Sequence, residues 1–437
     1  MVRDPLIFAA TSDLAGKMRG KAFPSRKLEK RIKSGVGWVP TNGLITCFDT
    51  IAPSPFGSLG DLALMPDPET LIQVDFEDGS APERFVLCDI TTTKGAPWSC
   101  CTRSMLKTAI ARLKACAGVT LNTAFEHEFQ IKQGPRAGGT AFTLESFAAQ
   151  RAFGETLMEV LSRAGLHTDS YLKEYGADQF EVTVEPQQGV VAADQAAILR
   201  SLTHMTARRF EQAITFSPIT DPAGVGNGVH IHMSFTNAAG APITYDPAGP
   251  CGMSHTTQCF IAGVLKYLPQ ILCLLAPSVI SYTRLTPHRW SAAFNNLGFQ
   301  DRETAVRICP VTATDPIGIA QQFNFEIRSL DAASSPHLAL AALVHAGCQG
   351  IEDNLDAPAI SEGDLSELSP KALADSGYVR LPESLKIALD AFEADKVVRG
   401  WFPDTFSQVY LAHKRAEITY VEGMTDSDRY DAYAGVY

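Results

Sequence analysis

Four short segments of the chain alternate polar with apolar residues, and their polar positions carry acids, histidines or an arginine. The segments are Phe125–Phe129, Gln179–Thr183, Val229–Met233 and Phe323–Arg328. Successive side chains of an extended strand point to opposite faces, so the alternation predicts four strands that each have one polar face. Charged side chains are costly to bury without partners. We therefore expect the four polar faces to line one concave site in which cations satisfy the carboxylates.

The spacing of apolar residues changes along the chain. Residues 1 to about 95 combine strand-like runs, such as Leu44–Phe48 and Phe85–Cys88, with Gly, Pro and Asp turns, which predicts a small α+β domain. From Arg103 onward the spacing is typical of long helices. Their expected ranges are Met105–Cys116, Phe147–Ala164, Ala193–Ile214, Thr257–Leu275, Leu338–Asn354, Leu385–Val398 and Thr405–Ile418. Because the apolar face of a strand must be covered, we expect these helices to back a sheet whose other face is the polar site.

Composition narrows the class of protein. A chain of 437 residues exceeds the usual size of one domain, and its 45% hydrophobic and 19% charged residues are ordinary for a globular protein. The formal net charge of -11 argues against a nucleic-acid-binding surface. The most apolar stretch, Cys259–Ile280, is interrupted by Lys266 and Pro269, so we expect a buried helix and no membrane span. No signal-peptide pattern is evident, and we expect a cytoplasmic protein.

The ten cysteines are scattered without the paired spacing of a zinc site. Adjacent Cys100 and Cys101 are more typical of reduced core thiols than of a redox pair. The sequence therefore assigns the cysteines no chemistry.

The polar faces supply a set of hard oxygen ligands and one imidazole. The set is Glu126, Glu128, Glu174, Glu181, Glu326 and His230. Carboxylates with one or two histidines suit Mg²⁺ or Mn²⁺, whereas zinc favours Cys and more His. Two such ions typically serve phosphoryl transfer. Arg302 and Arg307 can then bind phosphate, and Arg284 or Arg328 a substrate carboxylate.

Each segment also has a simpler interpretation. Glu126 and Glu128 alone are typical of a solvated edge strand, and His230 with His232 alone are as often hydrogen-bonded histidines as ligands. The two arginines alone are typical of surface cations that pair with neighbouring acids. The joint occurrence of four such segments favours the metal site.

Seven ordered motifs run nearly from end to end of the chain. They are Asp13–Lys17, Asp61–Asp67, Glu126–Phe129, Glu174–Glu181, Gly228–Ser234, Arg302–Pro310 and Glu326–Gly350. Together they resemble the glutamine synthetases and their γ-glutamyl-amide ligase relatives, such as γ-glutamylmethylamide and glutamylanilide synthases. The resemblance implies a small N-terminal β-grasp-like domain, at residues 1–97, and a large α/β half-barrel catalytic domain, at residues 98–437. The expected fold class is α+β.

The resemblance also implies a role for each polar residue. The metal ligands match Glu128, Glu174 and Glu181 on the amino-acid side, and Glu126, His230 and Glu326 on the nucleotide side. The expected cofactors are ATP, as co-substrate, and two or three Mg²⁺ or Mn²⁺ ions. His232, Ser234 and Asn324 fall at nucleotide-side positions. Arg284 and Arg328 match the residues that bind the glutamate carboxylates, and Arg302 and Arg307 match the pair that stabilises phosphate, with Arg307 also on the nucleotide side.

Two departures from the family concern the amine. Where glutamine synthetases carry a glutamate that deprotonates ammonium, this chain has Trp290, whose indole is no base but offers an apolar wall. A packed aromatic on a differently shaped loop is the alternative interpretation. Asp49 matches the aspartate that a neighbouring subunit contributes, but the segment after it, Thr50–Pro53, differs from the family pattern.

Two further departures surround the substrate and the nucleotide. The Asn-Gly pair that precedes His230 is displaced, and Gly226 and Gly228 remain as positions where backbone amides can approach the substrate. Asn324 replaces the arginine expected two residues before Glu326, which removes a cation near the phosphates.

We therefore expect an ATP-dependent ligase that joins the glutamate γ-carboxylate to an organic amine, either an alkylamine or an aromatic amine such as aniline, through γ-glutamyl phosphate. Ordinary glutamine synthesis from ammonia, with Asp49 or Glu174 as the base, is one alternative. A catalytically silent structural or ligand-sensing oligomer is another. The expected partners are glutamate, a small amine and further copies of the chain, in a ring-based dodecamer with sites at subunit interfaces.

Overall fold

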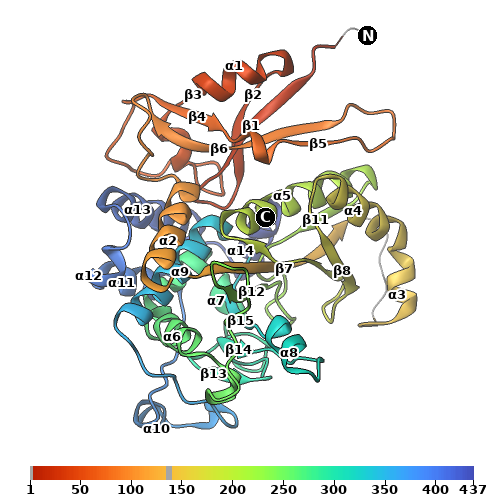
Figure 1. Ribbon diagram of the computed structural model, residues 1–437. Coiled ribbons are helices and arrows are strands. Elements are labelled where there is room, and N and C mark those ends of the chain that lie inside the picture. The colour runs from red at the N-terminus through yellow and green to blue at the C-terminus, as the bar shows by residue number, and fades with distance from the viewer. Residues whose placement is uncertain (1–2, 134–139) are drawn as a thin grey trace.

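The computed structural model describes residues 3–133 and 140–437, and it contains two β-sheets that follow one another along the chain (Figure 1). The first sheet has six strands in the order β2-β1-β6-β4-β3, with β5 beside β6. Its strands are β1 (Leu6–Ser12), β2 (Met18–Pro24), β3 (Val36–Trp38), β4 (Leu62–Pro66), β5 (Ile72–Val74) and β6 (Glu83–Thr92). The predicted run Phe85–Cys88 lies in β6, whereas Leu44–Phe48 forms only an isolated bridge between Ile45 and Ile51.

The second sheet has nine strands in the order β13-β14-β15-β12-β7-β9-β8, and β10 and β11 both pair with β7. Its strands are β7 (Thr120–Gln133), β8 (Thr168–Lys173), β9 (Gln179–Val184), β10 (Gln187–Gln188), β11 (Ala213–Thr215), β12 (Val229–Thr236), β13 (Leu297–Phe299), β14 (Val306–Ile308) and β15 (Phe325–Leu330). The four alternating segments fall in β15, β12, β7 and β9, which are adjacent in this order. The four predicted strands and the α+β class are confirmed.

Helix α1 (Leu28–Ser34) packs against β4 of the first sheet, and helices that follow β6 cover the apolar face of the second sheet. The helices after β6 are α2 (Thr102–Ala117), α3 (Leu144–Ala149), α4 (Arg151–Arg163), α5 (Val190–Arg209), α6 (His255–Leu275), α7 (Ser281–Arg284), α8 (Pro316–Gln322), α9 (Pro336–Glu352), α10 (Pro370–Asp375), α11 (Leu385–Ala394), α12 (Lys396–Arg399), α13 (Asp404–Val421) and α14 (Asp426–Val436). The alternate strand residues Phe125, Phe180, Ile231 and Phe325 are buried, while α5 contacts β7 and α6 contacts β15. Since apolar residues alternate with the charged ones, covering one face leaves the polar face for a site.

Helix α6 is long and apolar enough to cross a membrane by length and composition, but 78% of its apolar window is buried inside the protein. It packs against α9 and α11 in Figure 1 and is a core helix, as the interrupted apolar stretch predicts.

Helix boundaries differ from the sequence expectation at three places. The expected helix 147–164 breaks at Gln150 into α3 and α4. The expected helix 193–214 ends at Arg209, because Glu211 adopts a left-handed conformation with φ of 54° and the chain then joins β7 as β11. The expected helix 385–398 breaks at Asp395, whose carboxylate accepts hydrogen bonds from two backbone N–H groups of α12.

A buried arginine joins the first sheet to the helices of the larger part of the chain. Arg103, in α2, donates to Asp194 of α5 at 2.9 Å and also contacts Asp67, which follows β4, at 2.8 Å and Asp89 of β6 at 3.2 Å. His337 of α9 lies 2.7 Å from the same Asp194. The charged groups are therefore paired where α2 passes between the sheets.

Candidate active site

A cavity of about 580 Å³ opens on the polar face of the second sheet. Many of the residues singled out in the sequence line it. They are Glu126, Glu128, Glu174, Glu181, Gly226, His230, His232, Arg284, Trp290, Arg302, Arg307 and Arg328. Residues that are distant in sequence thus converge on one concave site, as the alternating segments predict.

Strand register explains why the charged residues meet in pairs. In the antiparallel ladder His230 lies opposite Glu126, and Glu128 lies opposite Glu181. On the other side of β12, Glu326 lies opposite His232 and also opposite Arg307 of β14. Directly opposite side chains of antiparallel strands share a face and lie close together. Each carboxylate therefore has a neighbour that the sequence alone does not specify.

Glu126, His230 and Glu326 form one group. His230 Nδ1 lies 3.3 Å from Glu126 Oε2 and 3.6 Å from Glu326 Oε1. Burial, with the nearby Arg328 guanidinium, lowers the pKa of His230 to about 4, so the imidazole is neutral near pH 7. Its Nε2 atom is buried and has no hydrogen-bond partner among the described residues. A neutral imidazole with a free nitrogen beside two carboxylates fits a metal ligand.

The carboxylates of Glu128 and Glu181 are crowded together in the same cavity. Burial raises the pKa of Glu128 to about 7 even though the backbone N–H of Gly228 donates to its Oε2 at 2.6 Å. Burial, followed by repulsion from Glu126 and Glu128, raises the pKa of Glu181 to about 9. Divalent cations would neutralise this repulsion, so the donor set fits hard cations such as Mg²⁺ or Mn²⁺.

Glu181 lies between the two expected ligand sets. The sequence places it with Glu128 and Glu174, but its carboxylate also lies within 4.8 Å of ligand atoms of Glu126 and His230. Glu326 accepts from Arg307 Nη1 at 2.8 Å and pairs with Arg328 as well. Glu174 lines the cavity and accepts a hydrogen bond from the Tyr175 backbone at 2.9 Å.

Arg284 extends a buried guanidinium beside two glycines. Its Nη1 atom has no hydrogen-bond partner among the described residues, which leaves a donor free for an anionic group. A Cβ atom at Gly228 would lie 2.4 Å from Arg284 Nη2, and one at Gly226 would lie 2.8 Å from its Cγ and Cδ atoms. Both glycines are thus required for the arginine to reach the cavity.

Trp290 stands at the cavity wall on a tightly held loop. Its backbone N–H donates to Glu303 Oε1 at 2.6 Å, and its carbonyl accepts from Arg328 Nη2 at 3.0 Å. The indole is 52% exposed, and its ring centroid lies 5.6 Å from that of Tyr175. Phe142 lines the same cavity. The site therefore has an aromatic wall close to its carboxylates.

A second cavity of about 520 Å³ adjoins the first and shares Glu126 and His232 with it. Ser234 and Asn324, the other nucleotide-side candidates, line this cavity. His232 donates from Nδ1 to Asn324 Oδ1 at 2.8 Å. The two cavities together offer adjacent compartments on either side of Glu126.

Asp49 is the candidate that this chain keeps apart from the cavity. It follows β3 in the part of the chain that forms the first sheet, and its backbone is left-handed, with φ of 58°. Its side chain is 81% exposed and accepts a hydrogen bond from Arg19 Nη2 at 3.0 Å. Among the described residues it lines neither cavity.

Sequence reasoning missed three residues near the site. Tyr175 was visible inside the motif Glu174–Glu181, and Glu303 beside Arg302, but nothing in the spacing indicated their contacts. Cys309 lies 3.6 Å from His232 Nδ1, although the cysteine pattern suggested no ligand. Only the fold brings that thiol to a polar face.

Two protein-family models match the chain. The model described as "Glutamine synthetase N-terminal domain" matches residues 3–98, and the one described as "Glutamine synthetase, catalytic domain" matches residues 99–433.

Individual proteins match nearly the whole length. The chain is 32% identical to the gamma-glutamylpolyamine synthetase of Streptomyces coelicolor, covering 99% of this chain and 93% of that protein. A crystal structure described as a novel glutamine synthase homolog superposes with a TM-score of 0.91 at 38% identity, covering 100% and 99% of the two chains. A structure described as the GmaS/ADP complex gives a TM-score of 0.81 at 25% identity, covering 97% and 95%.

Proposed function

Because the chain belongs to the glutamine synthetase family and is an ATP-dependent ligase of that type, we propose that it joins the γ-carboxylate of glutamate to an organic amine. The amine is an alkylamine or an aromatic amine. The observation that carries this choice is the aromatic wall of Trp290 and Tyr175 beside Glu174. An apolar wall favours a carbon-bearing amine over a small, strongly hydrated ammonium ion.

The proposed roles come from the family resemblance, and the positions of the side chains support them. Arg284, with its free Nη1, and Arg328 bind the carboxylates of glutamate, and Arg302 and Arg307 bind the transferred phosphate. His232, Ser234 and Asn324 lie on the nucleotide side, in the adjoining cavity. Glu126, Glu128, Glu174, Glu181, His230 and Glu326 hold two or three Mg²⁺ or Mn²⁺ ions, which neutralise phosphate charge when bound.

The reaction has two steps. An oxygen of the glutamate γ-carboxylate attacks the γ-phosphorus of ATP and forms γ-glutamyl phosphate, with ADP as the leaving group. The amine nitrogen then attacks the acyl carbon, phosphate leaves, and the amine gives up a proton to Glu174 or to Asp49. Loss of an acidic base at position 290 matters less for an aromatic amine, which is unprotonated at neutral pH, whereas an alkylamine arrives protonated and needs Glu174 or Asp49 to accept its proton.

We also propose that the enzyme is a cytoplasmic homo-oligomer, a ring-based dodecamer in which Asp49 completes the cavity of an adjacent subunit. The exposure of Asp49, its ion pair with Arg19 and its absence from the described residues that line the chain's own cavity support this arrangement. Heterologous contacts that close into a ring repeat one such site at every interface.

An amine panel tests the function. Phosphate release that depends on ATP and glutamate is measured with ammonia, methylamine, isopropylamine, aliphatic diamines and aniline, and the amide product is identified by mass. We expect an organic amine to give the highest kcat/KM and Trp290→Ala to reduce that preference. A marked preference of the natural enzyme for ammonia over every organic amine would contradict the proposal and favour glutamine synthesis.

A further inference from the structure

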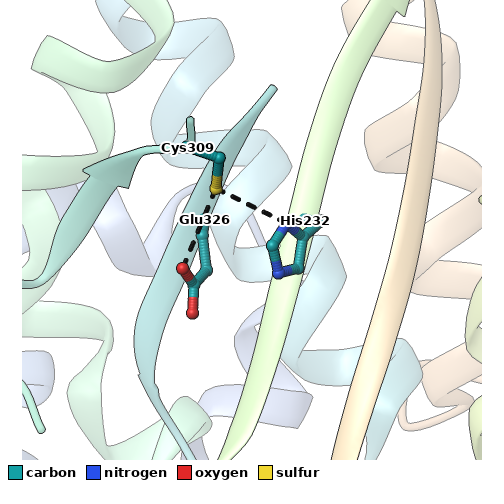
Figure 2. Close-up of side chains that lie close together, drawn as sticks. All are labelled: His232, Cys309 and Glu326. Carbon is teal, nitrogen blue, oxygen red and sulfur yellow. Dashed lines mark hydrogen bonds between the residues drawn. The ribbon is translucent and has the colours of Figure 1, made fainter. Parts of the chain in front are cut away.

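Three side chains at the nucleotide end of the polar face converge on one point. One of the three, Cys309, has no role in the proposed ligase reaction. Cys309 follows β14, His232 lies in β12 and Glu326 lies in β15 (Figure 2). The Cys309 Sγ atom is 3.6 Å from His232 Nδ1 and 3.8 Å from Glu326 Oε2. One ligand atom from each residue falls within 4.8 Å of the others.

These separations match those of a tetrahedral zinc site. Zinc bonds of about 2.3 Å to sulfur and about 2.0 Å to nitrogen, at a tetrahedral angle, place the two donor atoms about 3.5 Å apart. The same geometry places sulfur and a carboxylate oxygen about 3.6 Å apart. The two distances to sulfur, 3.6 and 3.8 Å, differ from these by about 0.1 to 0.2 Å. Arg307 Nη1 lies 2.8 Å from the same Glu326 Oε2 atom, so a bound ion takes the place of that guanidinium on the carboxylate.

The surroundings orient His232 for this role. Its Nε2 atom lies 3.0 Å from Glu126 Oε1, and its Nδ1 atom faces both Asn324 Oδ1 and Cys309 Sγ, so the ring has a carboxylate on the side away from the proposed ion, as in a carboxylate–histidine–metal arrangement. Asn324 places Oδ1 2.8 Å from the same Nδ1, and its own amide group donates to the Gln322 carbonyl at 2.9 Å. The amide oxygen is therefore fixed beside the point where the donors meet.

Asn324 also removes an obstacle. The glutamine synthetase resemblance expects an arginine at this position, and a guanidinium there would repel a metal ion. The neutral amide supplies an oxygen donor instead. Cys309 and Asn324 both lie beside the same histidine nitrogen.

We propose that Cys309, His232 and Glu326, with Asn324 Oδ1 as a fourth donor, form a site for a thiophilic divalent cation such as Zn²⁺. On binding, the thiol proton and the Nδ1 proton leave to solvent as the metal–sulfur and metal–nitrogen bonds form, with no change of oxidation state. Thiolate and imidazole select zinc over Mg²⁺. This site is distinct from the hard-cation set, but it shares Glu326 with it.

Sharing Glu326 makes the two kinds of occupancy compete. A zinc ion held by Cys309 draws the Glu326 carboxylate away from the nucleotide-side cation, so zinc lowers ATP-dependent turnover. This consequence rests on the proposed function, whereas zinc binding itself does not.

Cobalt spectroscopy on the metal-free full-length protein tests the binding. Co²⁺ bound by a thiolate in four-coordinate geometry gives a near-ultraviolet sulfur-to-cobalt charge-transfer band and intense visible bands. We expect both in the natural protein, at one equivalent per chain, with displacement by Zn²⁺. Cys309→Ser should abolish the charge-transfer band and weaken zinc binding by more than the roughly 10- to 100-fold typical of residues that only support a ligand.

A matched control is Cys259→Ser. Cys259 Sγ lies 3.6 Å from His255 Nε2, but among the described residues this pair belongs to no three-ligand group. The band should survive in this variant. An unchanged band in Cys309→Ser, or its loss in Cys259→Ser alone, would overturn the assignment.

A measurement on the natural protein avoids dependence on the folding of a variant. Zinc X-ray absorption should show one sulfur and about three nitrogen or oxygen neighbours. A shell of nitrogen and oxygen alone would refute the site.

Inhibition is then assayed at fixed Mg²⁺ and ATP, where Zn²⁺ should inhibit the natural enzyme at least about tenfold more strongly than Cys309→Ser. If the band appears but no amine is ligated, the zinc site stands and the proposed function fails.

Discussion

Glu181 shows how strongly the cavity depends on cations. Its carboxyl is buried, and repulsion from neighbouring carboxylates adds to burial in raising its pKa from 4.5 to about 9. A carboxyl that titrates so high is protonated in the folded protein at neutral pH but ionised in the unfolded chain. Ionising it in the fold without a cation costs stability.

Metal-free protein should therefore lose stability as pH rises. Between 4.5 and about 9 the folded state binds more protons at Glu181 than the unfolded state does, so the free energy of unfolding falls with pH. We expect Glu181→Gln to remove about 1 to 3 kcal/mol of this fall between about pH 5 and about pH 8. Denaturant unfolding of both proteins at the two pH values, with chelator present, measures the difference.

Saturating Mn²⁺ provides the control for that experiment. The ion should flatten the pH dependence of the natural protein, because it stabilises the ionised carboxylates, and should have less effect on Glu181→Gln. Equal slopes for the two metal-free proteins would show that the carboxyl is ionised in the fold, contrary to this account.

The loop before β12 controls how Arg284 reaches the cavity. Gly228 lies against that guanidinium, and a Cβ atom there would approach Nη2 to 2.4 Å. At Gly224, four residues earlier, an added Cβ atom would lie no closer than 3.5 Å to any other atom, which is an ordinary van der Waals distance. The two glycines thus form a matched pair within one segment.

Gly228→Ala should displace Arg284 and lower kcat/KM for glutamate by about 100-fold, since a misplacement near 1 Å can cost that much. The KM for ATP should change little, because the nucleotide-side residues line the adjoining cavity. Steady-state kinetics with each substrate varied separately provides the measurement. Gly224→Ala should retain the natural values; a similar defect in both variants would point to general disruption of the loop.

Asp194 joins α5 to α2 and α9 through its bonds to Arg103 and His337, and Arg103 in turn pairs with the first sheet. Asp194→Ala leaves two buried polar groups without this carboxylate, so we expect a loss of about 3 to 5 kcal/mol in the free energy of unfolding. Asp375→Ala, which breaks an exposed pair with Lys371, should change it by less than about 0.5 kcal/mol. Denaturant unfolding of both variants measures the contrast, and a small loss for Asp194→Ala would mean that solvent enters the junction.

Assembly can be tested by mixing two inactive variants. If Asp49 completes the site of a neighbouring subunit, Asp49→Ala and Glu128→Gln each abolish turnover in pure form. Co-assembled in equal amounts, they should regain about a quarter of the natural activity, since that fraction of sites has both intact residues. Turnover after co-refolding is the measurement. No recovery, despite mixed oligomers on size-exclusion chromatography, would place Asp49 outside the shared site.

The local alternation of polar and apolar residues predicts much of the fold. Alternation in Phe125–Phe129 and Val229–Met233 is sufficient to predict strands, because side-chain direction has a period of two whatever the neighbouring strand is. The same pattern shows which residues face the site. It does not predict helix ends such as Arg209, where the left-handed Glu211 and pairing with β7 decide the boundary.

The α+β class, the polar faces and, through the ordered motifs, the glutamine synthetase family can all be predicted from the sequence. Which side chains meet across strands depends on the folded protein, because register and sheet order are set by packing of the whole sheet. Glu181 thereby lies beside Glu126 and His230 as well as Glu128. Cys309 reaches His232 and Glu326 for the same reason: three strands distant in sequence become neighbours, and no spacing along the chain records that contact.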